Sequence, residues 1–340
     1  MVTKGLWSRR PRTSQPATSV AAREHSIQEF ISKYALFGAW ACTILIFALL
    51  EPHTFLARQN ITSTLSSQAV LVLLTYALMV ALTAGEYDVS VAAVLTLSSM
   101  VIAILNTEDH INIVLSILAA LAIGLLVGAI NGVVIVVIGV DSIIATLGMG
   151  SLLSGVVLWI SGGNTLSGIS NSLVTLVVVP HVFGLSLSFI YVVAATILLW
   201  YVLSYLPVGR RLLYVGRSRE VSRLTGLRVG RLRWGALIAA SFIAAAAGVL
   251  YAGTTGGADP TSGLSFLLPA FAGVFLGATT IQPGRFNAWG SFAAVYFLVT
   301  GIDGLSLLGI QVFVQDLFYG AALIVAVSVS MLARRRASAS

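Results

Sequence analysis

The chain has 340 residues, of which 58% are hydrophobic and only 9% are charged, and its formal net charge is +7. Soluble globular domains carry about 25% charged residues, so this composition excludes an ordinary soluble fold. The apolar residues form blocks of about 20, the length that a helix needs to cross a bilayer. The sequence therefore predicts an all-α, polytopic integral membrane protein.

The predicted spans follow one another with short connections. Residues 1–33 are predicted to be a cytoplasmic tail, residues 34–332 the transmembrane domain, and residues 333–340 a second cytoplasmic tail. The run at 173–180 is too short to span and is interpreted as an interfacial or re-entrant piece. We expect about ten transmembrane helices, with eight to ten allowed, at 34–50, 64–84, 88–105, 112–138, 143–160, 187–206, 235–254, 264–281, 286–301 and 312–332.

The basic residues set the expected orientation and argue against a nucleic-acid partner. They gather before the first span, in the loop at 207–234, and after the last span. The loop holds eight arginines against the single acid Glu220. Cytoplasmic loops of membrane proteins carry such an excess of lysine and arginine. An even number of crossings then places both ends of the chain and this loop in the cytoplasm.

The segment LTAGEYDVSVAAVLTLSSM, at 82–100, places two carboxylates between the second and third predicted spans. Gly85 loosens the helix there, and Asp88 or Ser90 is expected to cap the next helix, whose N-terminus favours negative charge. We interpret Asp88 and Ser90 as shaping a break beside a pathway. Asp88→Asn is therefore expected to be more damaging than Glu86→Gln.

Further polar residues lie within or near the predicted spans. Asn131 and Thr146 are inside the fourth and fifth spans, and Gln315 and Asp316 are near the start of the last. Polar groups at membrane depth face protein or a water-filled cavity, and ionisable ones are usually functional or paired. The candidate pathway residues are Gly85, Asp88, Ser90, Asn131, Thr146, Gln315 and Asp316.

The segment SREVSRLTG, at 218–226, predicts a short helix within the basic loop. Ser218 is a suitable N-cap and Gly226 a suitable terminator. The alternative is an ordinary cytoplasmic loop with the usual excess of positive charge.

Five motifs in order resemble the bacterial ABC importer permeases of the ribose/xylose/arabinose type, and the resemblance covers most of the chain. They are LTAGEYDVSVAAVLTLS, GLLVGAINGVVIVVIGVDSIIATLG, SGGNTLSG, VGRSREVSRLTGLRVGRLR, and GADPTSG followed by FAGVFLGATTIQPGRFNAWGSFAAV. The chain departs from the family pattern with Glu86 for an apolar residue, Val221 and Ser222 for two alanines, Ala278 and Pro283 for two glycines, and Leu267 or Leu268 for an acid.

This resemblance implies the permease subunit of an ABC importer for a monosaccharide or related small polar solute, in the bacterial cytoplasmic (inner) membrane. It implies three partners: an ATPase, a periplasmic or lipid-anchored solute-binding protein, and a second permease subunit, identical or not. No cofactor is expected on this chain, because ATP and Mg would belong to the ATPase. The resemblance assigns the coupling helix, which docks on the ATPase, to Arg219, Glu220, Val221, Ser222, Arg223, Leu224 and Gly226.

Other functions are weighed against this one. The sequence has no G-x-x-x-x-G-K-[ST] phosphate loop and no zinc-binding spacing of histidine and cysteine, so an enzyme is not expected. Related permeases carry branched-chain amino acids, nucleosides or a signalling furanone, and these cargoes stay open. An ion-coupled secondary transporter is a further alternative, and it would need Glu86, Asp88 or Asp316 as its coupling acid.

Overall fold

The computed structural model describes residues 19–178, 181–182, 184–311 and 313–339, so most of the predicted N-terminal tail lies outside the described residues. Within that part of the chain, helices dominate. The strands are two residues long and form two antiparallel pairs: β1 (Leu166–Ser167) with β4 (Gly257–Ala258), and β2 (His181–Val182) with β3 (Leu185–Ser186). The all-α prediction is confirmed.

The helices connect with few long loops. In chain order they are α1 (Ser19–Leu50), α2 (Pro52–Phe55), α3 (Arg58–Ser67), α4 (Ala69–Thr83), α5 (Val91–Ala103) with the π-helical turn η1 (Ile104–Glu108), α6 (Ile113–Gly132) with the π-helical turn η2 (Val133–Ile138), α7 (Ser142–Ser161), α8 (Asn171–Val178), α9 (Leu187–Ser204), α10 (Pro207–Arg217), α11 (Arg219–Leu224), α12 (Val229–Thr255), α13 (Ser262–Gly277), α14 (Ala288–Leu307) and α15 (Phe313–Ala339).

Among the described residues, eight helical stretches are long and apolar enough to cross a membrane: Lys33–Leu50, Arg58–Thr83, Val91–Glu108, Ile113–Ile138, Ser142–Ser161, Leu187–Ser204, Val229–Thr255 and Ala288–Leu307. Two shorter apolar helices, Ser262–Gly277 and Phe313–Ser328, occupy the places of the other two predicted segments. A polytopic membrane protein is therefore confirmed. The number of crossings and the side on which the chain ends lie stay predictions.

Helix boundaries depart from the sequence expectations in a few places. The second predicted span is two helices, α3 and α4, which meet at Gln68. Helix α1 begins at Ser19, so it starts within the predicted tail, and α15 continues to Ala339. The predicted loop at 207–234 is largely helical, since it holds α10, α11 and the start of α12.

Helix α4 lies at the centre of the bundle and packs most extensively against α12 and α13. All of α4 except Leu73 is buried, which its continuous apolar sequence allows. Helix α6 approaches α12 closely because a Cβ on Gly124 would lie 2.5 Å from the Ala245 Cβ, and one on Gly128 would lie 2.6 Å from the Ile238 Cα. Small residues permit such backbone contact between membrane helices. Few residues are buried in the stretch Lys33–Leu50 of α1, in α7 and in α9, as expected for apolar helices that face lipid.

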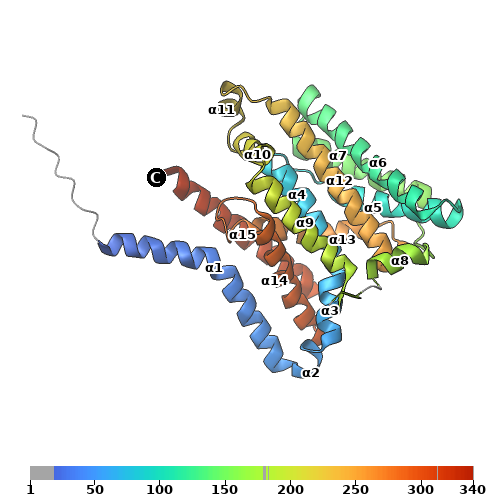
Figure 1. Ribbon diagram of the computed structural model, residues 1–340, viewed down its shortest axis with the longest axis horizontal. Helices are drawn as coiled ribbons and strands as arrows, with labels where there is room; N and C mark the ends of the chain where they lie inside the picture. The colour runs from blue at the N-terminus through green and yellow to red at the C-terminus, as the bar shows by residue number, and fades with distance from the viewer. Residues whose placement is uncertain (1–18, 179–180, 183, 312, 340) are drawn as a thin grey trace, which may run out of the picture.

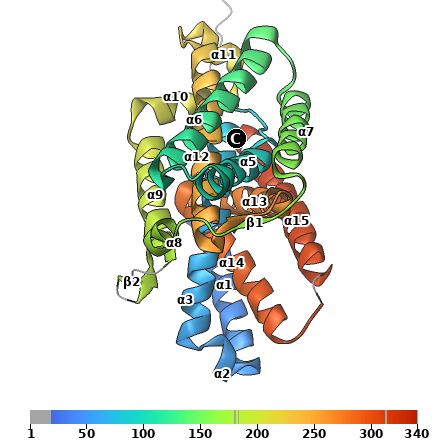
Figure 2. The same cartoon turned by 90° about the vertical axis from the view of Figure 1, so that its right-hand side faces the viewer.

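The two ends of the bundle differ. Helix α11 lies at one end, and α2 and α3 lie at the other, in both views (Figures 1 and 2). The short helix α8, at the predicted 173–180 segment, packs its buried Leu173 and Val177 beside Gly253 of α12. Residues 179 and 180 lie outside the described residues. Whether α8 is interfacial or re-entrant stays a prediction.

Candidate functional sites

The break between α4 and α5 is closed by a glycine turn. Gly85 has φ +79°, and its amide donates to the Leu82 carbonyl while the Glu86 amide donates to the Ala81 carbonyl. A glycine in this conformation ends many helices, because a Cβ would be strained there. The prediction that Gly85 loosens the chain at this point is confirmed.

Asp88 and Ser90 organise the start of α5, but not as predicted. The Asp88 Oδ1 atom accepts from the Ser90 amide at 3.1 Å and from the Ser90 hydroxyl at 2.5 Å. The Ser90 side chain makes no capping bond, so of the two candidate caps, Asp88 and Ser90, the serine does not cap α5. Its hydroxyl is instead occupied by Asp88 and by Asn131 of α6, whose Nδ2 donates to it at 2.9 Å.

A second group of bonds ties the break to α7. Thr146 donates its hydroxyl to the Tyr87 carbonyl at 3.0 Å and accepts from the Val89 amide at 3.1 Å. Ser142 accepts from the Tyr87 amide at 3.2 Å. Thr146, like Asp88, Ser90 and Asn131, is buried. These candidates therefore come together as a buried polar network that holds α5, α6 and α7 at the break.

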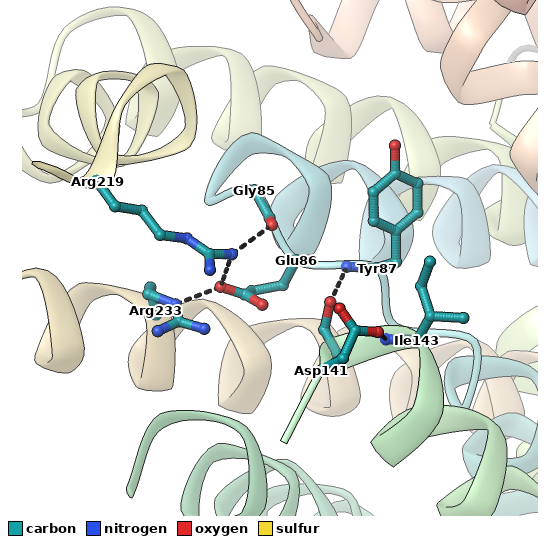
Figure 3. Close-up of polar contacts among 8 residues, drawn as sticks. Gly85, Glu86, Tyr87, Asp141, Ile143, Arg219 and Arg233 are labelled. Atoms are coloured by element: carbon teal, nitrogen blue, oxygen red, sulfur yellow. Dashed lines mark hydrogen bonds and ion pairs between the residues drawn. The ribbon is translucent and has the colours of Figure 1, made fainter. Parts of the chain in front are cut away.

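Glu86 is the residue of this break whose role the sequence left unassigned. Its side chain is fully buried, and Oε1 accepts from Arg219 Nη2 at 2.9 Å and from Arg233 Nε. Arg219 also donates to the Gly85 carbonyl at 2.9 Å. Figure 3 shows the two arginines converging on the carboxylate from α11 and from the start of α12. The buried charge is thus paired, as a carboxylate away from water must be.

Helix α11 matches the predicted short helix in the basic loop. The Ser218 hydroxyl accepts from the Val221 amide at 3.3 Å, which confirms its role as N-cap. Gly226 has φ +80°, and its amide donates to the Arg223 carbonyl, so it ends the helix as predicted. Val221 and Leu224 are exposed by 59% and 83%, leaving an apolar pair on the free face of α11.

A polar cavity of about 390 Å³ opens in the half of the molecule opposite α11, between α3, α4, α13, α14 and α15. Asp303 joins two of these helices by accepting from Asn60 Nδ2 at 2.9 Å and from the Thr64 hydroxyl at 3.1 Å. Other hydroxyl and amide groups on the wall belong to Ser63, Ser67, Gln68, Ser265, Ser306 and Gln315.

Gln315 and Asp316, the two polar residues predicted near the start of the last span, lie in different surroundings. Gln315 lines this cavity and donates to the Ser306 hydroxyl at 3.0 Å. Asp316 is exposed and does not line it. Of the predicted pathway residues, Gln315 therefore lies at the cavity and Asp316 does not. The other five, Gly85, Asp88, Ser90, Asn131 and Thr146, lie together at the break.

Sequence reasoning missed most of the cavity. Five of its polar lining residues, Asn60, Ser63, Thr64, Ser67 and Gln68, come from the stretch RQNITSTLSSQ at 58–68. The hydroxyl-rich composition of this stretch, just before an apolar run, was a usable signal. No described group of three or more histidine, cysteine, aspartate or glutamate side chains is placed to hold a metal ion.

Comparison with known proteins supports the sequence resemblance. The D-allose transport system permease protein AlsC of Escherichia coli K12 is 28% identical over 303 residues, which cover 89% of this chain and 93% of AlsC. The ribose import permease protein RbsC of Bacillus subtilis is 30% identical over 285 residues, covering 84% and 88%. The autoinducer 2 import system permease protein LsrC of an Enterobacter species is 29% identical over 287 residues, covering 83% and 79%.

No solved structure matches the chain significantly. The family model that does match is described as branched-chain amino acid transport system / permease component, and it matches residues 60–327, from α3 to within α15. That match covers most of the chain and includes the break, the helix α11 and the polar cavity. The chain therefore belongs to the branched-chain amino acid transport system / permease component family.

Proposed function

We propose that the chain is the membrane-spanning permease subunit of an ABC importer and that it carries a monosaccharide or a related small polyhydroxy solute. The main support for a polyhydroxy solute is the cavity of about 390 Å³, which is lined by hydroxyl and amide groups. Two of the relatives are named for allose and ribose. A neutral sugar is bound through hydrogen bonds to such groups and is released without breaking an ion pair.

The family description raises the amino-acid alternative directly, and the cavity argues against it. A branched-chain amino acid presents a carboxylate, which arginine binds best. Among the described residues that line the cavity there is no lysine or arginine. Its single charged group, Asp303, is already bonded to Asn60 and Thr64. The lining therefore favours a neutral solute over a zwitterion.

The proposed energy source is ATP hydrolysed on a separate chain. Helix α11 lies at one end of the bundle (Figure 1). Its residues Glu220, Val221 and Leu224 are exposed, and this free face suits a groove on an ATPase. ATP and Mg would be bound by that partner. We place this end in the cytoplasm, because the loop around α11 carries the excess of arginine.

The remaining partners follow from the same proposal. Apolar side chains are exposed along α7, including Ile144 and Trp159, so this surface belongs in the bilayer or against a second permease subunit. A solute-binding protein would dock at the end opposite α11, where the cavity lies. The proposed membrane is the bacterial cytoplasmic (inner) membrane.

The proposed pathway residues are those of the cavity, with Gln315 retained from the sequence candidates. Asp88, Ser90, Asn131 and Thr146 are proposed to shape the break and not to touch the solute, since they are buried and bonded to one another or to the backbone of the break.

The test uses proteoliposomes that contain the chain with its cognate ATPase, supplied with the solute-binding protein. We expect uptake of a radiolabelled monosaccharide, and no uptake of leucine. Gln315→Ala should raise the KM for uptake by about fivefold to tenfold, the loss expected for one hydrogen bond of about 1–1.5 kcal/mol. Asp316→Asn, one residue away and outside the cavity lining, is the matched control. Leucine uptake, or equal effects of the two variants, would contradict the assignment.

A further inference from the structure

Glu86 is a buried carboxylate whose partners both come from the segment 207–234, here called the coupling loop. Arg219 lies on α11 and Arg233 on the first turns of α12, and both donate to the same Glu86 oxygen. The Arg219 side chain is 49% exposed and that of Arg233 only 15%. A buried carboxylate without a partner is strongly unfavourable, so the break keeps this conformation only while the loop supplies its arginines.

The contact between the coupling loop and the break extends to the backbone. A Cβ on Gly85 would lie 3.3 Å from the Gly216 Cα, and one on Gly216 would lie 3.2 Å from the Gly85 amide nitrogen. The last turn of α10 therefore rests directly on the last turn of α4. Because neither surface has side chains that could give way, a displacement of the loop must displace the break as well.

The break is joined in turn to the membrane helices that follow it. Two residues beyond Glu86, Asp88 binds Ser90, and Ser90 accepts from Asn131 of α6. Thr146 of α7 binds the backbone on both sides of Asp88. Glu86 thus stands between the coupling loop, whose two arginines bind it (Figure 3), and the start of α5, which is bonded to α6 and α7.

We propose that Glu86 is a positioning residue of the transport cycle, which fixes the coupling loop to the α4–α5 break through Arg219 and Arg233 so that movement of α11 moves α5. This inference rests on the proposed function, in which an ATPase moves α11. Glu86 touches no solute and no ATPase.

The test compares Glu86→Gln, Arg219→Gln and the double variant in proteoliposomes with the ATPase and the solute-binding protein. Glu86→Gln, which lies outside the coupling helix, should retain co-purification of the ATPase and ATP hydrolysis. For Arg219→Gln, on the coupling helix itself, transport is normalised to the ATP that this variant hydrolyses. Solute imported per ATP hydrolysed should fall at least about fivefold, the lower end of ordinary coupling between sites. The double variant should lose no more than the more severe single variant, because both remove one interaction. Glu108→Gln, an exposed acid at the opposite end of α5, is the control.

The inference is overturned if Glu86→Gln imports solute per ATP at the parental ratio, or if the two single losses multiply in the double variant. If Glu86→Gln does not fold, Arg219→Gln provides the test, because Arg219 is half exposed and the mostly buried Arg233 stays paired with Glu86. A merely structural role would lower thermal stability without changing the ratio of solute to ATP.

A second readout separates this inference from the proposed function. In the purified chain alone, Arg219→Gln should speed amide hydrogen exchange at residues 84–90, which are far from position 219 in sequence. Unchanged exchange there would overturn the role of Glu86, even if the parental complex imports sugar. Faster exchange together with a parental complex that imports no tested solute would count against the proposed function and leave the link through Glu86 standing.

Discussion

Replacing Gly216 by alanine should push α10 away from the end of α4. A Cβ on Gly216 would fall well inside contact distance of the Thr83 carbonyl oxygen, 3.1 Å from the Thr83 carbonyl carbon and 3.2 Å from the Gly85 amide nitrogen. All three are backbone atoms, so no side chain can rotate to make room. Since carbon and oxygen atoms normally stay about 3.3 Å apart or more, α10 must shift by about 1 Å.

The magnitude follows from two opposing terms. Overpacking of a well-packed site destabilises by about 1–3 kcal/mol. Replacing glycine by alanine within a helix stabilises the helix by about 1 kcal/mol, because alanine has the higher helix propensity. The net loss for Gly216→Ala is therefore between about 0 and 2 kcal/mol. The shift also carries Arg219 away from Glu86, since Arg219 follows Gly216 by three residues and its ion pair is 2.9 Å long.

The matched control is Gly235→Ala on α12, because a Cβ there would meet nothing within 4 Å. We expect the unfolding midpoint in detergent, followed by tryptophan fluorescence, to fall for Gly216→Ala and to stay or rise for Gly235→Ala. Solute imported per ATP should fall only for Gly216→Ala. If both variants raise the midpoint and transport normally, the close contact between α10 and α4 does not exist as described.

Three further predictions concern the break and the coupling helix. Glu86→Gln should lower the unfolding midpoint more than Asp88→Asn, the reverse of the order expected from sequence, because it leaves the mostly buried Arg233 unpaired; equal midpoints would refute this. Asn131→Ala should destabilise by about 1–3 kcal/mol by removing the buried donor to Ser90, measured by the same unfolding assay. Ser218→Ala should weaken α11 by about 1 kcal/mol through loss of its N-cap, and so reduce co-purification of the ATPase under stringent washing.

The spans were predictable because their signal is local and repeated. A block of about 20 apolar residues has one stable arrangement in a bilayer, a helix, whatever the rest of the chain does. The expected segment 143–160 differs from α7 (Ser142–Ser161) by a single residue at each end. The division of α3 from α4 was not predictable, because it depends on how Arg58–Ser67 packs at the end of the bundle.

The difference between local signals and long-range packing also explains which parts of the sites could be predicted. Helix α11 could be placed from sequence, because Ser218 and Gly226 act within their own turn of chain. The partners of Glu86 could not, because Arg219 and Arg233 lie 133 and 147 positions away. One signal was present: an unexplained acid on the side of the membrane where the arginines were expected. Because Glu86 and the arginines of the 207–234 loop carry opposite charges on the same side of the membrane, an ion pair between them could have been expected.

The measurement that tests the central claim most directly is the energy source of uptake. Proteoliposomes would contain the chain with or without its cognate ATPase, with the solute-binding protein and a labelled monosaccharide outside. We predict uptake that requires both the ATPase and ATP, and that persists when proton and sodium gradients are abolished. Uptake driven by a proton or sodium gradient without the ATPase would contradict the account and identify a secondary transporter.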